Sequence, residues 1–235
     1  MKYFLTCLFV LFRLTCFATY YSQCNQDGYV NETYFKNYRN GTFIDIGAHN
    51  GITYSNSYFF EKELGWQGIC IEPIPEVFAQ LRANRTCHCV QGCVSDRSGE
   101  EQLLRVISPC TSTEMLSGLL YKYDPLHLQR ILAEIRCFGG TYEIIPVQCY
   151  LLNDLLEEHG ITHVNFLSID VEGGEYDILT SIDFSRCQID IITVENNYGD
   201  PRFTPLLKEK GFNLIGHLEQ DLLFVHKDFQ LPEQL

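Results

Sequence analysis

The feature that most constrains the fold is a short apolar run that contains one acid and ends directly at a glycine. The run is Thr42–Ile46, its acid is Asp45, and residues 47–51 (GAHNG) follow it. A run of this length with glycine at its end predicts a buried strand and then a tight turn. Such a turn lets a ligand approach the backbone at the carboxyl end of a sheet. The sequence therefore predicts an α/β domain with a ligand site at that edge.

Patterns typical of strands and helices alternate along the rest of the chain. Further strands are expected at residues 68–72, 87–94, 101–107, 143–148, 163–169 and 189–194. Helices are expected at residues 54–64, 75–81, 125–136, 151–159, 175–182 and 204–210, with an insertion over the sheet at 108–140. Residues 212–216 and 222–226 are expected to form a closing hairpin. This order predicts a mostly parallel sheet with one antiparallel strand.

Composition limits the number of domains and the class of partner. The chain has 235 residues, of which 46% are hydrophobic and 20% charged, and this suits a single globular core. Its formal net charge is −13, and it has no cluster of Lys or Arg of the kind that binds a phosphate backbone. We therefore expect no nucleic-acid partner, and the expected substrate is a small molecule, a glycan or a protein.

Residues 1–20 have the pattern of a secretory leader, and residues 21–235 are expected to form the domain. Lys2 precedes an apolar run, and Cys16-Phe17-Ala18 is suited to cleavage before Thr19. Arg13 interrupts the run, so an uncleaved membrane anchor and an N-terminal strand or helix of the fold are alternatives. The expected location is the secretory pathway, either secreted or in the lumen of the endoplasmic reticulum or Golgi, or membrane-anchored if the leader stays.

Cysteines and glycosylation triplets are compatible with that location. The chain has 11 cysteines, a high number for a cytosolic protein, which suggests disulfide bonds. Asn31, Asn40 and Asn84 each begin an Asn-X-Thr triplet. These triplets also arise by chance, and they are compatible with a glycoprotein.

Acids at three successive strand ends indicate a nucleoside-containing cofactor. Asp45 can accept hydrogen bonds from an ammonium group, and Glu72 is placed to bind both ribose hydroxyls. Asp96, after the third strand, would lie near the adenine amino group. His49 occupies a position where a dinucleotide fingerprint has glycine, which counts against NAD. The alternatives are that Glu72 only precedes a proline turn and that Asp96 only opens one.

A second set of acids follows the later strands, where the substrate should lie. Asp170 ends one strand, and Glu195 and Asn196 end the next. Their oxygens could bind Mg²⁺, which would lower the pKa of a bound hydroxyl and align it. His49 and His163 are reserve candidates for the catalytic base. The alternative is that these acids only bond backbone amides and each other around the pocket.

Several ordered motifs resemble the FkbM family of methyltransferases. They are residues 43–51 (FIDIGAHNG), 69–73 (ICIEP), 94–96 (VSD), 169–175 (IDVEGGE) and 194–195 (VE), and the likeness begins near Tyr21. The resemblance implies the Rossmann-like class I methyltransferase fold, with a seven-stranded sheet and helices on both faces. It also implies S-adenosylmethionine as cofactor and O-methylation of a sugar or natural-product hydroxyl. In the family pattern, the methionine end of the cofactor lies by Asp45 and Gly47, its ribose binds Glu72, and its adenine lies near Asp96. Gly51 is also expected to line the cofactor site.

Two other functional classes compete with a methyltransferase of hydroxyl groups. The first is a secreted or anchored interaction module that kept the fold and lost the chemistry, and the leader favours it. Retention of acids at three strand ends favours the enzyme instead, because an inactive module has no physical need for them. The second is a nicotinamide oxidoreductase, which His49 in the glycine turn disfavours.

Overall fold

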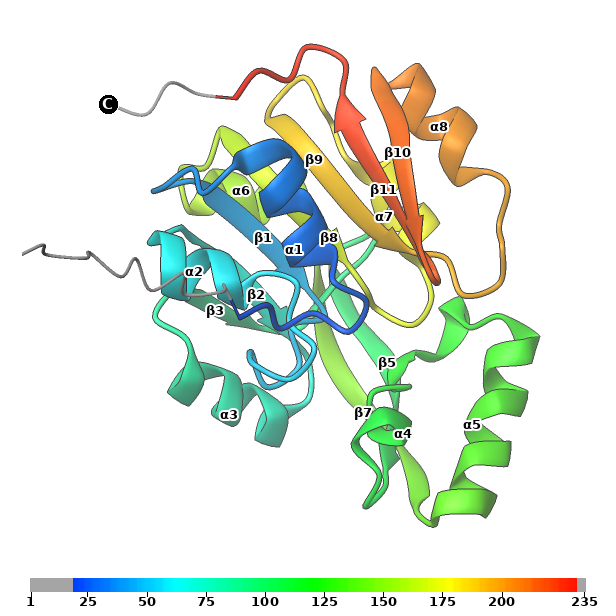
Figure 1. Cartoon of the computed structure of the whole chain (residues 1–235). Coiled ribbons are helices and arrows are strands. Elements are labelled where there is room, and N and C mark those ends of the chain that lie inside the picture. The colour runs from blue at the N-terminus through cyan, green and yellow to red at the C-terminus, as the bar shows by residue number, and fades with distance from the viewer. Residues whose placement is uncertain (1–18, 232–235) are drawn as a thin grey trace, which may run out of the picture.

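Seven strands form the main sheet of the computed structural model, which describes residues 19–231 (Figure 1). Their spatial order is β10 (Phe212–Leu218), β11 (Asp221–His226), β9 (Gln188–Glu195), β8 (His163–Ile169), β1 (Thr42–Ile46), β2 (Gln67–Glu72) and β3 (His88–Gln91). Only β11 runs antiparallel to its neighbours, β9 and β10. The predicted class I fold, with one antiparallel strand supplied by the closing hairpin, is confirmed.

Helices cover both faces of the main sheet, as predicted. One face packs against α6 (Leu152–Glu158), α7 (Glu175–Ser181) and α8 (Phe203–Glu209). The other packs against α1 (Gln26–Val30), η1 (Asn31–Phe35), α2 (Tyr58–Leu64) and part of α3 (Pro75–Asn84). Strand residues alternate between the two cores, so that Ile44 and Ile46 point to the first face and Phe43 to the second. The sequence did not predict α1 or η1, because their segment is polar and aromatic.

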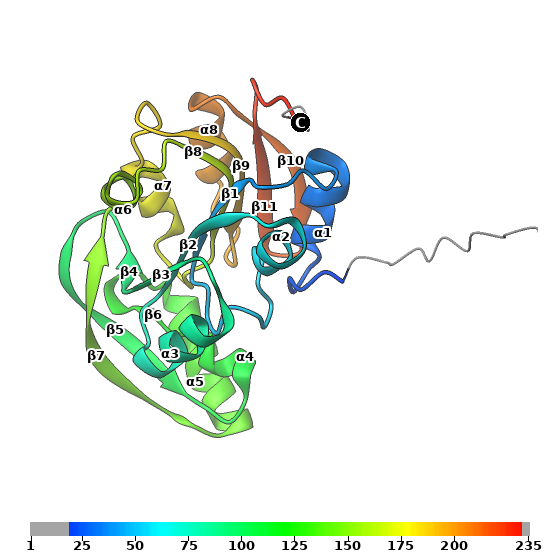
Figure 2. The ribbon, with the colours of Figure 1, turned by 90° about the vertical axis from the view of Figure 1, so that its left-hand side faces the viewer.

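A second, four-stranded sheet lies beside the first, and it corrects two expectations (Figure 2). Its order is β4 (Cys93–Val94), β7 (Thr141–Tyr150), β5 (Gly99–Ile107) and β6 (Gly118–Leu119). The strands expected at 101–107 and 143–148 exist, but they pair with each other rather than joining the main sheet. The strand expected at 87–94 is broken at Gly92, whose backbone passes so close to the Gln148 carbonyl that a Cβ would lie 2.5 Å from it.

The insertion between β5 and β7 carries α4 (Thr111–Glu114), η2 (Leu120–Lys122) and α5 (Pro125–Phe138). Helix α5 matches the predicted segment at 125–136. It begins at Pro125, and the Asp124 side chain caps it by accepting a 2.7 Å bond from the Leu126 N–H. His127 and Ile131 are its buried residues. The insertion therefore presents one face of α5 to the interior.

The structure bears differently on the expected leader, the expected disulfides and the expected glycosylation sites. The leader's cleavage segment at residues 16–18 lies outside the described residues. The nine cysteines within residues 19–231 are free thiols, so the expected disulfides are absent from that range. Asn31 is 1% exposed and its amide donates to Tyr20 and Asn37, so this triplet does not present a glycan acceptor, whereas Asn40 and Asn84 are exposed. No helix in the described range has the length and apolarity needed to cross a membrane.

Candidate active site

A cavity lies at the carboxyl ends of the central strands, between the main sheet and the second sheet. We call it the main cavity. The ends of β1, β2, β8 and β9 contribute Gly47, Glu72, Asp170 and Glu195 to its lining. The second sheet closes it with apolar residues that include Leu103. The structure thus has a cavity at the sheet edge where the glycine turn predicts a ligand.

Gly47 allows the ends of β1 and β8 to come together. Its φ is +87°, and a Cβ there would lie 1.7 Å from the Asp170 carbonyl oxygen. No side chain fits in that space, so glycine is required for these two strand ends to lie this close. Gly51 has a different role, because a Cβ there would meet the side chains of Arg85 and Leu81, and Gly51 does not line the main cavity. The prediction that Gly51 contacts the cofactor is therefore not supported by its position.

Asp45 lies on the cavity wall within a buried polar network. It is 4% exposed and accepts hydrogen bonds from the hydroxyls of Ser57 (2.5 Å) and Ser55 (3.3 Å). Behind the serines lies the buried guanidinium of Arg85, which donates to Ser57 (3.0 Å) and to Glu61 (2.6 Å). Burial raises the pKa of Asp45, while Arg85 and the serine hydroxyls act to lower it. This network fixes the turn after β1, and one Asp45 oxygen is already committed to it.

Glu72 ends β2 as a buried carboxyl group, and no basic side chain within residues 19–231 bonds to it. It is 5% exposed and accepts a 2.9 Å bond from the Ile74 N–H. Burial raises its pKa to about 7. It lines the main cavity, so its carboxyl group is available to accept hydrogen bonds from a ligand there.

Asp96 does not lie where the strand order predicted. It is outside the lining of the main cavity and forms an ion pair with Lys122, with Oδ1 and Nζ 2.9 Å apart. The reason is that the chain leaves the main sheet at Gly92 and enters the second sheet as β4. Asp96 is thereby carried away from the strand ends. Apolar residues that precede it, Cys93 and Val94, line the cavity in its place.

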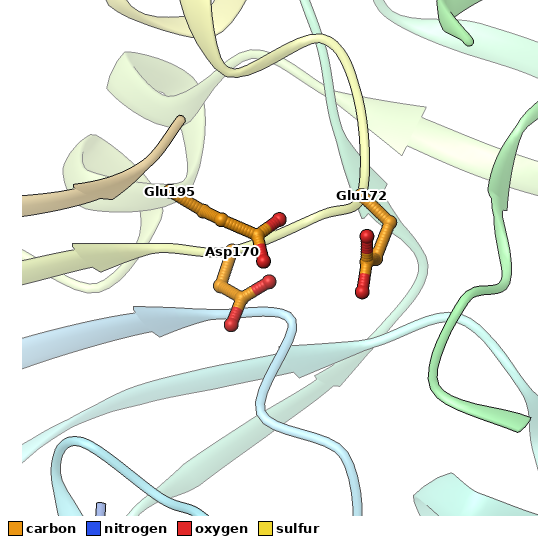
Figure 3. A group of neighbouring side chains, drawn as sticks. All are labelled: Asp170, Glu172 and Glu195. Carbon is orange, nitrogen blue, oxygen red and sulfur yellow. The ribbon is translucent and has the colours of Figure 1, made fainter. Parts of the chain in front are cut away.

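Three carboxyl groups meet where the main cavity borders β8 and β9 (Figure 3). Asp170, Glu172 and Glu195 offer oxygens that all lie within 4.8 Å of one another, and we call them the acid cluster. Burial, together with the charges of Asp221 and Glu175, raises the pKa of Asp170 to about 8. Burial and then the charge of Asp170 raise the pKa values of Glu172 and Glu195 well above the usual range. At neutral pH the cluster therefore either keeps protons or needs a cation.

Glu172 is the member that sequence reasoning missed. It lies in a left-handed backbone conformation, with φ +59°, and this turns its side chain toward Asp170 and Glu195. Asn196, the third predicted metal ligand, does not point there. Its amide group closes a loop instead, donating to the Asp200 carbonyl (3.1 Å) and accepting from the Asp200 N–H (2.7 Å).

The two candidate histidines lie in very different places. His49 lines the main cavity and has φ +47°, and both of its ring nitrogens are buried with no hydrogen-bond partner among the described residues. Burial lowers the pKa of His49, which favours the neutral ring. His163 begins β8 at the opposite end of the strand and bonds Asp190 at 2.8 Å. His163 is therefore not a candidate for the base.

A buried histidine from α5 lies behind Glu172. His127 Nε2 lies 3.0 Å from the Leu116 carbonyl, which only accepts, so Nε2 carries the proton. Its Nδ1 lies 3.0 Å from the Tyr198 hydroxyl and 3.5 Å from a Glu172 oxygen. Asn197 donates to the same oxygen at 3.0 Å. Periodicity alone could not place this contact, because it joins the insertion to the β8 loop.

Comparison with known proteins identifies the same region of the chain. The family model described as the methyltransferase FkbM domain matches residues 45–224, a range that includes Asp45, Glu72 and the whole acid cluster. A curated relative, 31-O-demethyl-FK506 methyltransferase FkbM from Streptomyces tacrolimicus, is 29% identical over 207 residues. The aligned part covers 77% of this chain and 75% of that protein.

Solved structures give a more distant likeness. The METTL16 MTase domain matches 86% of this chain with a TM-score of 0.46 at 12% identity, and this chain spans just under two thirds (66%) of it. A methyltransferase from Pyrococcus furiosus matches 88% of this chain and 84% of its own with a TM-score of 0.42 at 12% identity. The fold assignment is carried by the strand order and the family match rather than by these two structures.

Proposed function

Since the chain belongs to the FkbM family of S-adenosylmethionine-dependent methyltransferases, we propose that it methylates a hydroxyl oxygen of a sugar, a glycan or a small molecule. The observation that carries the choice of oxygen is the acid cluster beside the main cavity. Carboxylates around an amine would keep it protonated, without the lone pair that must receive the methyl group. A hydroxyl keeps its lone pairs and needs only alignment and a proton acceptor.

The main cavity offers groups that suit S-adenosylmethionine. Glu72 can accept from two ribose hydroxyls, and Ile74 and Leu103 supply apolar surface for a base. Asn56 lines the same cavity and is 7% exposed, and its Oδ1 has no partner in the part of the chain that the structure describes, so it can accept from an ammonium group. When bound, the cofactor supplies an electrophilic methyl group on a positively charged sulfur.

The acid cluster and His49 are the candidates for catalysis. In the proposed reaction the acceptor oxygen bonds to the methyl carbon as the carbon–sulfur bond breaks, and the bonding pair stays on sulfur. The hydroxyl proton passes to a carboxylate of the cluster, with Asp170 or Glu195 as the acceptor. Their raised pKa values make the ionised forms stronger bases than ordinary carboxylates. Neutral His49 offers a second proton acceptor on the cavity wall.

We extend the proposal to Mg²⁺ held by Asp170, Glu195 and Glu172. Three carboxylates suit a hard cation, and a cation would remove their mutual repulsion. Its binding should release protons, because the raised pKa values leave protons on the cluster at neutral pH. Calorimetric titration with MgCl₂ in two buffers of different ionisation enthalpy measures that release, and a chelator should lower turnover at least about tenfold. Full turnover in the presence of the chelator, with no proton release on titration with MgCl₂, would show that no metal takes part. The carboxylates would then act directly.

The affinity for S-adenosylmethionine should depend on pH through Glu72. The pKa of this carboxyl group is about 7, and the ionised form accepts the stronger hydrogen bonds. Affinity is thus expected to be full above pH 7 and to fall by up to about tenfold as the pH drops below it. The Glu72→Gln variant should bind more weakly and lose this dependence. An equally steep pH profile in the variant would assign the titration to another group.

The rival interaction module and the choice of oxygen are tested by one labelling experiment. The family match and the strand-end acids at Asp45 and Glu72 give no support to an inactive module. From the pattern of residues 1–20 we also propose entry into the secretory pathway, where cofactor made in the cytosol would have to be transported. Incubation of purified protein with methyl-labelled S-adenosylmethionine and a panel of hydroxyl compounds and amines tests the activity. Cofactor binding with no label transferred to any hydroxyl, and transfer to amines instead, would overturn the choice of oxygen.

A further inference from the structure

A second cavity borders the acid cluster at Glu172 and Glu195. It shares Glu172, Gly173, Glu195 and Asn197 with the main cavity. The rest of its wall comes from the loop before α5, the start of α7 and the loop between β9 and α8. A cofactor in the main cavity and an acceptor in the second cavity could therefore meet at the acid cluster without overlapping.

Aromatic side chains give the second cavity an apolar wall. Tyr176 packs edge-on against Phe203, with ring centroids 5.8 Å apart, and the Arg202 guanidinium lies 4.0 Å over the Tyr176 ring. Tyr123 stacks on buried His127 at 4.6 Å. Tyr198 is 38% exposed, the most open of these rings. Tyr198 is thus the ring best placed to stack on a ligand.

The charges in this lining disfavour an anionic ligand. Its two basic side chains are already paired, Lys122 with Asp96 and Asp177, and Arg202 with Asp200. Acids outnumber them even without the acid cluster, because the lining also includes Asp124, Glu175, Asp177 and Asp200. A carboxylate or phosphate on the ligand would meet repulsion and no unpaired cation among the residues that line this cavity.

We infer that the second cavity binds the acceptor, and that the acceptor is a neutral polyhydroxylated ring such as an uncharged sugar. The hydroxyl groups of such a ring can donate hydrogen bonds to Glu172 and Glu195. Its C–H groups can pack on the face of the Tyr198 ring, which carries partial negative charge. The inference rests on the proposed function and narrows its substrate class from hydroxyl compounds in general to uncharged sugars.

Binding measured without turnover tests this inference. The protein is saturated with S-adenosylhomocysteine, and saturation-transfer NMR records binding of the methyl glycosides of glucose, galactose, mannose and fucose. Methyl glucuronide, glucose 6-phosphate and glucosamine are the charged competitors. We expect at least one neutral glycoside to bind and the two anions to bind at least about tenfold more weakly.

Variants of the second cavity distinguish the loss of a stacking contact from a general effect on folding. Tyr198→Ala should weaken the neutral glycoside at least about fivefold, in line with the loss of one stacked ring, and Tyr198→Phe should restore it. Tyr142→Ala, at an exposed tyrosine on β7, is the matched control and should change nothing. Asp200→Asn leaves Arg202 without its charged partner, so it should raise binding of methyl glucuronide relative to the neutral glycosides.

The outcomes distinguish this inference from the proposed function. Calorimetry with S-adenosylmethionine reports the main cavity independently of the acceptor. If the cofactor binds but no neutral glycoside does, or if the anions or glucosamine bind best, the inference is wrong while the cofactor site stands. The inference is also wrong if Tyr198→Ala binds the glycoside as well as Tyr142→Ala does. If the cofactor itself does not bind, the proposed function fails first.

Discussion

Replacing Asp170 with asparagine is expected to lower kcat by about a hundredfold to ten-thousandfold, the usual range for loss of a general base. An amide has nearly the shape of the carboxylate but accepts no proton at neutral pH and is a weaker ligand for a cation. Affinity for S-adenosylmethionine should stay within about twofold, because Glu72 and the glycine turn are untouched. Steady-state kinetics on any accepted hydroxyl compound, with calorimetry for the cofactor, measures both quantities.

The matched control is Asp183→Asn. Asp183 is an exposed acid after α7 whose side chain bonds only its own turn at Ser185. The control should keep the wild-type rate. If Asp170→Asn also keeps full kcat with the cofactor bound, Asp170 has no catalytic role, and Glu195 is the carboxylate left to accept the proton.

The second large effect is on stability. Arg85→Met should lower the free energy of unfolding by about 3–5 kcal/mol, the usual cost of removing one partner from a buried ion pair. The Arg85 side chain is fully buried and pairs with Glu61, which is 7% exposed. Its loss leaves Glu61 and Asp45 without the cation that offsets their burial. Urea unfolding measures the difference.

An exposed ion pair provides the comparison. Arg186 and Glu157 lie on the surface, so Arg186→Met should cost at most about 1 kcal/mol. The double variant Arg85→Met with Glu61→Gln should recover part of the loss, because it removes the unpaired carboxylate. Equal stabilities for Arg85→Met and Arg186→Met would show that the buried network does not hold the turn after β1.

Local patterns were enough to predict the main sheet. The strand expected at residues 163–169 is β8 as observed, and the closing hairpin supplies the one antiparallel strand. The second sheet was not predicted, because β5 and β7 have strand patterns that do not show which sheet they join. Their pairing, from Gly99 with Cys149 to Ile107 with Thr141, closes a long insertion that periodicity does not describe.

The site was predictable where it depends on strand ends and not where it depends on loops. Asp170 and Glu195 could be placed together because parallel neighbouring strands bring their carboxyl ends to one edge. Glu172 needed a left-handed backbone conformation, and His127 needed the packing of α5, and neither leaves a clear signal in the sequence. Asp96 was misplaced because the chain turns into the second sheet just before it.

Titration of S-adenosylmethionine into the purified protein and into Glu72→Ala tests the placement of the cofactor most directly. We expect saturable binding at one site per chain. We also expect the variant to lose about 1.5–3 kcal/mol of binding free energy, the value of a charge-assisted hydrogen bond. Absence of binding to the wild-type protein, or equal affinity in Glu72→Ala, would contradict the placement of the cofactor in the main cavity.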